Sequence, residues 1–385
     1  MYTIGIDLGT TLSRVAVLDD KGRPEIMENA EGELMTPSVV YFGEEGVIVG
    51  REAVVAGRDN PERVVRYAKR WLGDSQVNWE IDGTFYSPVD ISSFILRKLR
   101  DDFVRIRGPV SRAVISVPAH FDANQRRLTM EAALQADITQ VDLVNEPVAS
   151  ALMFVIGESI EAQALAADQT LVVYDLGGGT FDLSLVRYND KKVSVIASTG
   201  DLQLGGIDWN ERIVEQLALR FVAAHGLDFR TDRKFMTSMD ERAEQAKRSL
   251  STPNVTKQKV QIKYLGRELV TVIQRSEFEE WTRDLVERTC LLTEQLIEDG
   301  GTELVDINNL LVVGGSTRMP MIREAVKVLR EDHLKGWTNP EFDPTSKISP
   351  EFAVAQGALM KCFLSNASYK SLSVFATSSH SGIGV

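Results

Sequence analysis

A pattern that occurs twice limits the possible folds of this chain more than any other feature. Residues 4–20 read IGIDLGTTLSRVAVLDD, and residues 170–190 read TLVVYDLGGGTFDLSLVRYND. Each copy has an apolar run that ends at an aspartate, a Leu-Gly step, a small polar turn, and a second run that alternates apolar and polar residues. Alternation with period two is typical of strands. Both copies therefore predict a β-hairpin, unlike nucleotide loops in which glycines open a helix.

Two later segments extend the duplication. Residues 112–118 (RAVISVP) form an apolar run before the helical pattern of 124–136, and residues 308–320 (NNLLVVGGSTRMP) precede a similar pattern at 321–329. Chance recurrence of a short Asp-Leu-Gly string is the competing interpretation, and the agreement of the flanking strands counts against it. Two copies of one plan predict an α/β chain with two similar lobes that face each other.

Each lobe is expected to carry an insert. We expect lobe I at 1–167 with an insert at about 36–104, and lobe II at 168–350 with an insert at about 208–288. The patterns inside the inserts are strand-like at 38–50, helical at 91–103, 209–226 and 239–251, and hairpin-like at 260–275 with Leu265-Gly266 at its turn. Residues 367–385 are rich in serine and are predicted to be a linker.

Composition excludes several classes of protein. The 385 residues carry a net charge of −12, with 43% hydrophobic and 25% charged residues, which argues against a general binder of nucleic acid or anionic membranes. Two cysteines, no signal peptide and no long apolar run favour a cytoplasmic protein. The four histidines lie far apart without metal-ligand spacing, so a zinc site is not expected.

Three glycine turns are candidate phosphate sites: Gly9–Leu12, Gly177–Thr180 and Gly314–Ser316. Bare backbone N–H groups form concave nests for anions. The carboxylates of Asp7, Asp175 and Asp182 would repel a polyphosphate unless a cation came with it, and Mg²⁺ prefers oxygen ligands and keeps several waters. Turn-capping aspartates or a β-bulge are the structural alternatives. The repetition of an aspartate before a glycine turn favours a Mg-nucleotide site.

Six motifs, in order, resemble the ATPase domain of the seventy-kilodalton heat-shock chaperones (the DnaK type), from residue 3 to about 364. They are IGIDLGTT, VPAHFDANQRR, VNEPVASAL, VYDLGGGTFDLS, AEQAKRSLS and VVGGSTRMP. The resemblance implies the two-lobed actin-like ATPase fold, with duplicated ribonuclease-H-like lobes around a central nucleotide cleft. It implies ATP or ADP and Mg²⁺ as cofactors, with K⁺ as a further expectation. It also implies that 351–366 form a C-terminal helix that returns to lobe I.

The resemblance also implies roles for individual residues. Lys69 would act near the γ-phosphate, Asp7, Asp175 and Glu146 would hold Mg²⁺ mostly through water, and Thr180 and Asp182 would help place the attacking water and K⁺. Contacts to ATP would come from Gly9, Thr10, Thr11, Leu12, Gly177, Gly178, Gly179, Glu244, Lys247, Arg248, Ser251, Gly314, Gly315, Ser316 and Arg318. On helical spacing alone, the face with Glu244 and Lys247 would be read as an ordinary solvated face.

Pro118 and Arg126 match the switch and relay by which this family reports nucleotide state to the linker, and His120 stands where the family usually has tyrosine. The implied function is slow ATP hydrolysis that gates peptide binding by a C-terminal domain, whose start is expected at the end of the linker within 367–385 and whose remainder is expected to be missing here. Implied partners are unfolded client peptides, J-domain co-chaperones and nucleotide exchange factors, with no nucleic acid or membrane. The alternatives are an actin-like filament-forming ATPase, a small-molecule kinase, and a co-chaperone or exchange factor with weak hydrolysis.

Overall fold

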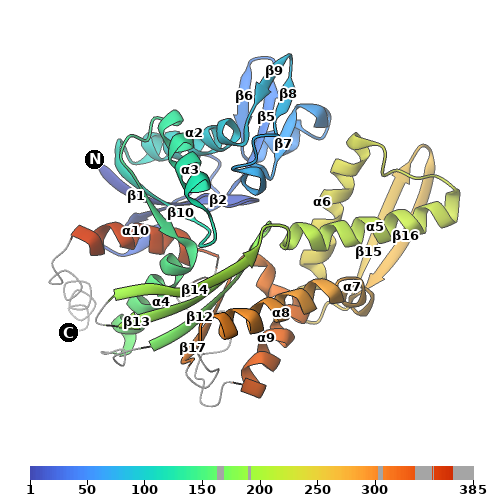
Figure 1. Cartoon of the computed structure of the whole chain (residues 1–385). Helices are drawn as coiled ribbons and strands as arrows, with labels where there is room; N and C mark the ends of the chain where they lie inside the picture. Colours follow the sequence, from blue (N-terminus) through green and yellow to red (C-terminus); the bar gives the residue numbers. More distant parts are fainter. Residues whose placement is uncertain (163–168, 190–191, 302–306, 334–348, 350, 367–385) are drawn as a thin grey trace, which may run out of the picture.

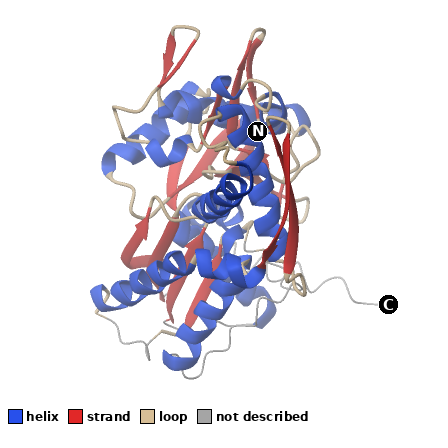
Figure 2. Ribbon diagram, turned by 90° about the vertical axis from the view of Figure 1, so that its right-hand side faces the viewer, coloured by secondary structure: helices blue, strands red, loops and turns tan. Residues whose placement is uncertain are grey.

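The chain folds around two central β-sheets, each carrying an inserted unit (Figure 1). The structure is a computed structural model that describes residues 1–162, 169–189, 192–301, 307–333, 349 and 351–366. The predicted boundary between the lobes at 167/168 and the predicted linker at 367–385 lie outside the described residues. Figure 2 shows the strands of the sheets flanked by helices.

The first sheet has the strand order β11-β10-β1-β2-β3, with β4 also paired to β2. Strand β1 runs antiparallel to β2 and parallel to β10. The predicted hairpin is thus confirmed, with its turn between Asp7 and Leu12. The strands are β1 (Tyr2–Asp7), β2 (Leu12–Leu18), β3 (Pro24–Ile26), β4 (Thr36–Pro37), β10 (Val110–Val117) and β11 (Val141–Asn145).

The second sheet repeats this plan in the order β14-β13-β12-β17. Strand β12 is antiparallel to β13 and parallel to β17, just as β1 is to β2 and β10. Its strands are β12 (Gln169–Leu176), β13 (Phe181–Asn189), β14 (Lys192–Asp201) and β17 (Asn309–Val313). The matching orders confirm the duplication predicted from the two Asp-Leu-Gly segments.

Two helices, α4 (Glu146–Ala162) and α10 (Ala353–Asn366), lie between the sheets. Glycines let them approach closely. A Cβ built on Gly357 of α10 would overlap the backbone of Ala149 in α4, and one on Gly5 of β1 would overlap the backbone of α10. Residues of α4 and α10 share small apolar clusters with both sheets, so these helices join the lobes into one body.

The outer helices and the inserts complete the fold. Lobe I has α3 (Ala123–Gln135), and its insert has β5 (Val39–Gly43), β6 (Gly46–Val49), α1 (Arg51–Ala56), η1 (Pro61–Arg63), β7 (Val64–Arg66), η2 (Ala68–Trp71), β8 (Trp79–Ile81), β9 (Thr84–Tyr86) and α2 (Pro88–Ile106). Lobe II has α5 (Gly206–His225), α6 (Arg233–Leu250), β15 (Lys257–Tyr264), β16 (Arg267–Gln274), α7 (Arg275–Trp281), α8 (Arg283–Asp299), η4 (Gly315–Arg318) and α9 (Pro320–His333).

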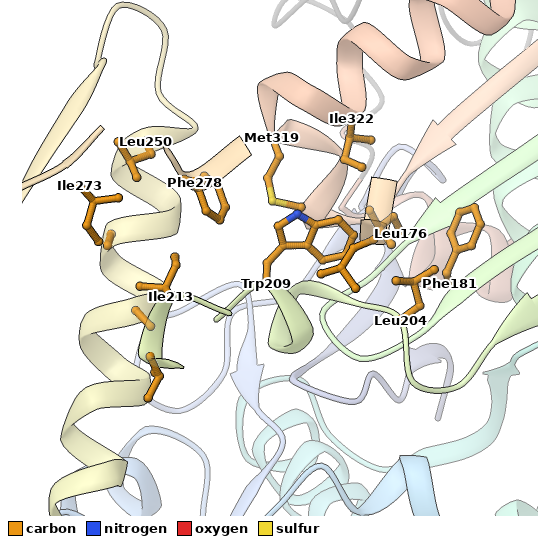
Figure 3. Packing of buried hydrophobic residues seen from close by; sticks show 14 of the residues in the cluster. Leu176, Phe181, Leu204, Trp209, Ile213, Leu250, Ile273, Phe278, Met319 and Ile322 are labelled. Carbon is orange, nitrogen blue, oxygen red and sulfur yellow. The ribbon is translucent and has the colours of Figure 1, made fainter. Parts of the chain in front are cut away.

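Each lobe shares one apolar core with its insert. In lobe II, the fully buried Trp209 of α5 lies between Leu176 of the central sheet and Phe278 of α7, as Figure 3 shows. Burying one large aromatic side chain contributes roughly 2–3 kcal/mol. Because this core runs from the sheet into the insert, α5 and α6 are held rigidly beside the glycine turn that follows β12.

Candidate functional site

The two predicted phosphate turns meet at the junction of the lobes. A Cβ built on Gly178 would overlap the Thr11 side chain, and one built on Gly179 would overlap the Thr10 side chain. Only glycine therefore allows the second turn to approach the threonines of the first so closely. The first turn is braced from the insert, because the Ser38 hydroxyl donates to the Gly9 carbonyl at 2.7 Å.

The N-terminus of α5 lies against the second turn. The backbone N–H of Gly206 donates to the Gly177 carbonyl at 3.1 Å, and that of Ile207 donates to the Gly178 carbonyl at 2.8 Å. A Cβ on Gly205 would be 2.5 Å from the Gly179 carbonyl carbon. This glycine pair was not among the residues predicted from the sequence. The signal was present, since Gly205-Gly206 directly precedes a predicted helix and helix N-termini favour anions.

Lys69 and Glu146 form a buried ion pair beside the turns. The Lys69 Nζ, in η2, donates to the Glu146 Oε1 at 2.7 Å, and both side chains are 8% exposed. Burial lowers the pKa of Lys69, but Glu146 and Asp7 outweigh burial and raise it, so the ammonium stays charged. Burial, opposed by Lys69, raises the pKa of Glu146 to about 7. The sequence places these residues 77 positions apart.

Aspartates from both hairpins surround this pair. Asp175 of β12 and Asp182 of β13 are opposite each other in the strand pairing. Asp7, at the end of β1, forms an ion pair with Arg14 at 2.9 Å. The pKa of Asp175 is raised well above its usual value by burial and then by repulsion from Glu146, Asp182 and Asp7. Carboxylates crowded in this way favour a nearby cation.

The carboxylates at this site are ligands of the kind that Mg²⁺ takes. Among the described residues, no three His, Cys, Asp or Glu side chains converge closely enough to hold a metal ion directly. Mg²⁺ usually keeps several waters and takes one or two carboxylates together with phosphate oxygens. Asp7, Asp175 and Glu146 are therefore suited to hold the ion through water, and bound Mg²⁺ would neutralise charge on the phosphates.

Arg70 links the lobes next to Lys69, and the sequence analysis did not single it out. Its Nε donates to the Gly179 carbonyl at 2.7 Å, and its Nη2 lies 2.7 Å from the Oδ2 of Asp208. Asp208 also accepts from the Gly205 N–H at 2.7 Å and so caps α5. One guanidinium from the insert of lobe I thus contacts both the second turn and the start of α5.

The predicted residues of α6 form a connected group. Glu244 lies 2.7 Å from both Lys247 and Arg248, and the buried Lys247 Nζ donates to the Gly206 carbonyl at 2.7 Å. Burial raises the pKa of Glu244, but Lys247 outweighs burial and lowers it to about 2. Ser251 caps the helix, because its hydroxyl donates to the carbonyl of Lys247.

The third glycine turn joins the second one. The Ser316 hydroxyl donates to the Gly177 carbonyl at 2.7 Å. Gly314 has φ +87°, and a Cβ there would be 2.6 Å from the Asp175 Oδ1, so glycine is required. Gly315 follows at the start of η4. Arg318 pairs instead with Glu351, at 3.1 Å.

The residues predicted to relay nucleotide state lie where β10 ends. Arg126 of α3 donates to the carbonyl of Phe121 at 2.9 Å and to that of Ala119 at 3.2 Å, and it lies 3.4 Å from the Pro118 carbonyl. Burial lowers the pKa of Arg126. In the same turn, the His120 Nδ1 lies 2.8 Å from the Asp182 Oδ1. Of these residues, His120 is therefore in contact with the second glycine hairpin.

Two sheets of one plan, with glycine hairpins in contact at their junction, define the two-lobed actin-like ATPase fold predicted from the sequence. A family model described as "Hsp70 protein" matches residues 3–375. The chain belongs to the Hsp70 family.

Curated relatives agree with the family. The chain is 37% identical over 370 residues to the chaperone protein DnaK of Thermotoga neapolitana, and 36% identical over 370 residues to that of Thermotoga petrophila. Each alignment covers 94% of this chain and 59% of the relative, so the chain spans somewhat more than half the length of these proteins. Both relatives are named as chaperone proteins. None of the helices in the described ranges is long and apolar enough to cross a membrane.

Proposed function

We propose that this chain is the Mg-ATP-binding and slowly ATP-hydrolysing part of a molecular chaperone. The observation that carries the proposal is the contact of the two glycine hairpins around a buried Lys69–Glu146 pair. Phosphoryl transfer depends mostly on positioning and charge stabilisation, so one buried lysine, hydrated Mg²⁺ and backbone N–H groups suffice without a covalent nucleophile.

In this proposal the residues act as the sequence analysis predicts. The turns at Gly9–Leu12 and Gly177–Thr180 bind the phosphates, while Lys69 neutralises developing charge. Asp7, Asp175 and Glu146 hold Mg²⁺ through water, and Thr180 and Asp182 place the attacking water, with K⁺ as a further cofactor. The nucleoside lies between the polar face of α6 and the third turn, and its contacts come from Glu244, Lys247, Arg248, Ser251, Gly314, Gly315, Ser316 and Arg318.

The domain boundaries and the coupling belong to the same proposal. Lobe I at 1–167 and lobe II at 168–350 close on ATP, the helix at 351–366 returns to lobe I, and Pro118, His120 and Arg126 report closure to a peptide-binding domain. Arg70 supports this idea, since it already bridges the lobes at 2.7 Å from both Gly179 and Asp208. Client peptides, J-domain proteins and exchange factors are the proposed partners, and the cytoplasm is the proposed location.

Lys69→Ala tests the mechanism. We expect Mg-ATP to bind with an affinity within about 10-fold of the unmutated chain, while single-turnover hydrolysis falls by at least about 100-fold. Calorimetry measures binding, and quenched flow measures hydrolysis. Lys98→Ala is the matched control, because Lys98 pairs with Asp102 and Glu31 in the same lobe, away from the junction. Undiminished turnover in Lys69→Ala would contradict the assignment. Binding without turnover in the unmutated chain would favour the weakly hydrolysing co-chaperone.

A further inference from the structure

His120 belongs to lobe I but contacts a residue of lobe II. It follows β10 of lobe I, yet its Nδ1 lies 2.8 Å from the Oδ1 of Asp182 in β13 of lobe II. A Cβ built on Gly200 of β14 would be 3.3 Å from the same nitrogen. The imidazole therefore lies against two adjacent strands of the second sheet, at the point where the second glycine hairpin begins its return strand.

The polar atoms at this contact are buried and have few partners. Within the described residues, the His120 Nδ1 and the Asp182 Oδ1 have no partner besides each other, the His120 Nε2 has none, and Asp182 is only 2% exposed. A buried polar group without a partner costs about 1–3 kcal/mol. The contact between Nδ1 and Oδ1 is therefore the one that satisfies both atoms.

The charges around the imidazole come from three further elements. Asp182 on β13 and Glu146 on α4 raise the pKa of His120, Lys69 on η2 lowers it, and burial is the largest lowering influence. The net direction is upward, so the carboxylates outweigh burial. An imidazole in these surroundings is a good hydrogen-bond donor to the Asp182 carboxylate, which lies 2.8 Å away.

We propose that His120 is a positioning residue for ATP hydrolysis, which holds the Asp182 carboxylate in place across the junction of the lobes. Because the imidazole belongs to lobe I and the carboxylate to lobe II, the carboxylate is oriented toward the attacking water only when the lobes are together. This inference rests on the proposed function. It gives His120 a part in the hydrolytic step itself, in addition to the relay predicted from the sequence.

Three substitutions of His120 distinguish the role of Nδ1 from that of Nε2. Asn carries an amide nitrogen near the place of Nδ1, Gln carries one near the place of Nε2, and Phe keeps the ring without nitrogen. We expect His120→Phe and His120→Gln to lower kcat about 10- to 100-fold with KM nearly unchanged, as the loss of one hydrogen bond to a charged group implies. His120→Asn should keep most of the activity. Equal losses in all three variants would overturn the assignment of Nδ1.

A double-mutant cycle tests whether His120 acts through Asp182. In an Asp182→Asn background, His120→Phe should cause no further loss of kcat, because the partner is already absent. Losses that multiply would overturn the inference. If the unmutated chain does not hydrolyse ATP, the proposed function itself fails. If the unmutated chain is active and His120→Phe is fully active, only this inference fails.

A readout without nucleotide comes from the histidine ring signals in NMR. The chain has four histidines, so substitution of each one assigns its signal. We expect Asp182→Asn to lower the pKa of His120 in the nucleotide-free protein, because the carboxylate 2.8 Å from Nδ1 is then absent. An unchanged titration of His120 would show that the two side chains do not interact and would overturn the inference.

Discussion

The Nζ of Lys69 and the Oε1 of Glu146 lie 2.7 Å apart, with each side chain 8% exposed. Removing one member of such a pair leaves an uncompensated buried charge, which typically costs 3–5 kcal/mol, whereas removing both is much less destabilising. Lys69 also faces Asp7 and Asp182, which raise its pKa together with Glu146. The lysine therefore stabilises the fold as well as serving the proposed chemistry.

Lys69→Met should lower the free energy of unfolding at pH 8 by about 3 kcal/mol, because the buried Glu146 loses its counter-charge and must stay charged without a partner or take up a proton. Lys69→Met combined with Glu146→Gln should recover at least about half of the loss. Urea denaturation of both variants measures this difference. Equal stability of the single and double variants would show that the pair is not coupled.

The contact between the two hairpins can be tested in the glycine triplet of the second hairpin, where Gly177 is the control for Gly178 and Gly179. Gly178→Ala and Gly179→Ala should weaken Mg-ATP binding about 10- to 100-fold, because the new methyl group would overlap Thr11 or Thr10 and push the hairpins apart. Gly177→Ala places its Cβ 3.5 Å from the Thr180 carbonyl oxygen, an ordinary contact, and should bind ATP within about 3-fold of the unmutated chain. Calorimetry distinguishes the three. Identical affinities for all of them would argue against direct contact between the hairpins.

Arg70→Ala should raise the dissociation rate of ATP about 10-fold. The guanidinium connects the insert of lobe I to Gly179 and Asp208, and charge-assisted hydrogen bonds contribute about 1.5–3 kcal/mol. Stopped-flow release of a fluorescent ATP analogue measures the rate. Arg127→Ala is the control, since Arg127 is exposed on α3 and pairs with Glu131 in its own helix. An unchanged dissociation rate of ATP in Arg70→Ala would mean that the contacts of Arg70 with Gly179 and Asp208 do not hold the lobes together on ATP.

Asp240 on α6 should make stability depend on pH. Burial raises its pKa to about 6, against an opposing effect of Arg66. An acid with a raised pKa in the folded state binds more protons there than in the unfolded state, so stability falls as pH rises from about 4 through 6. Asp240→Asn should flatten this decline and add up to about 2 kcal/mol of stability at pH 7.5. Denaturation at pH 5 and pH 7.5 measures how the free energy of unfolding changes with pH. An equal change in Asp240→Asn and in the unmutated chain would contradict the role of Asp240.

The hairpins and the duplication could be predicted from the sequence, because strand alternation and the Asp-Leu-Gly turns are local features. The strands predicted within 112–118 and 308–320 are present and pair in parallel with β1 and β12, but the strand order of each sheet was not predicted. The roles of the site residues stay predictions. They came from the resemblance of six motifs, since spacing alone favoured a solvated face for Glu244 and Lys247.

The sequence by itself determined the two-lobed plan and the three glycine turns. The tertiary structure decided which side chains meet: Lys69 with Glu146, Arg70 with Gly179 across 109 positions, and His120 with Asp182. No local pattern encodes such pairs, because the two partners of each pair belong to segments that lie far apart in the sequence. They come together only when α4, α10 and the glycines that admit them bring the two sheets into one body.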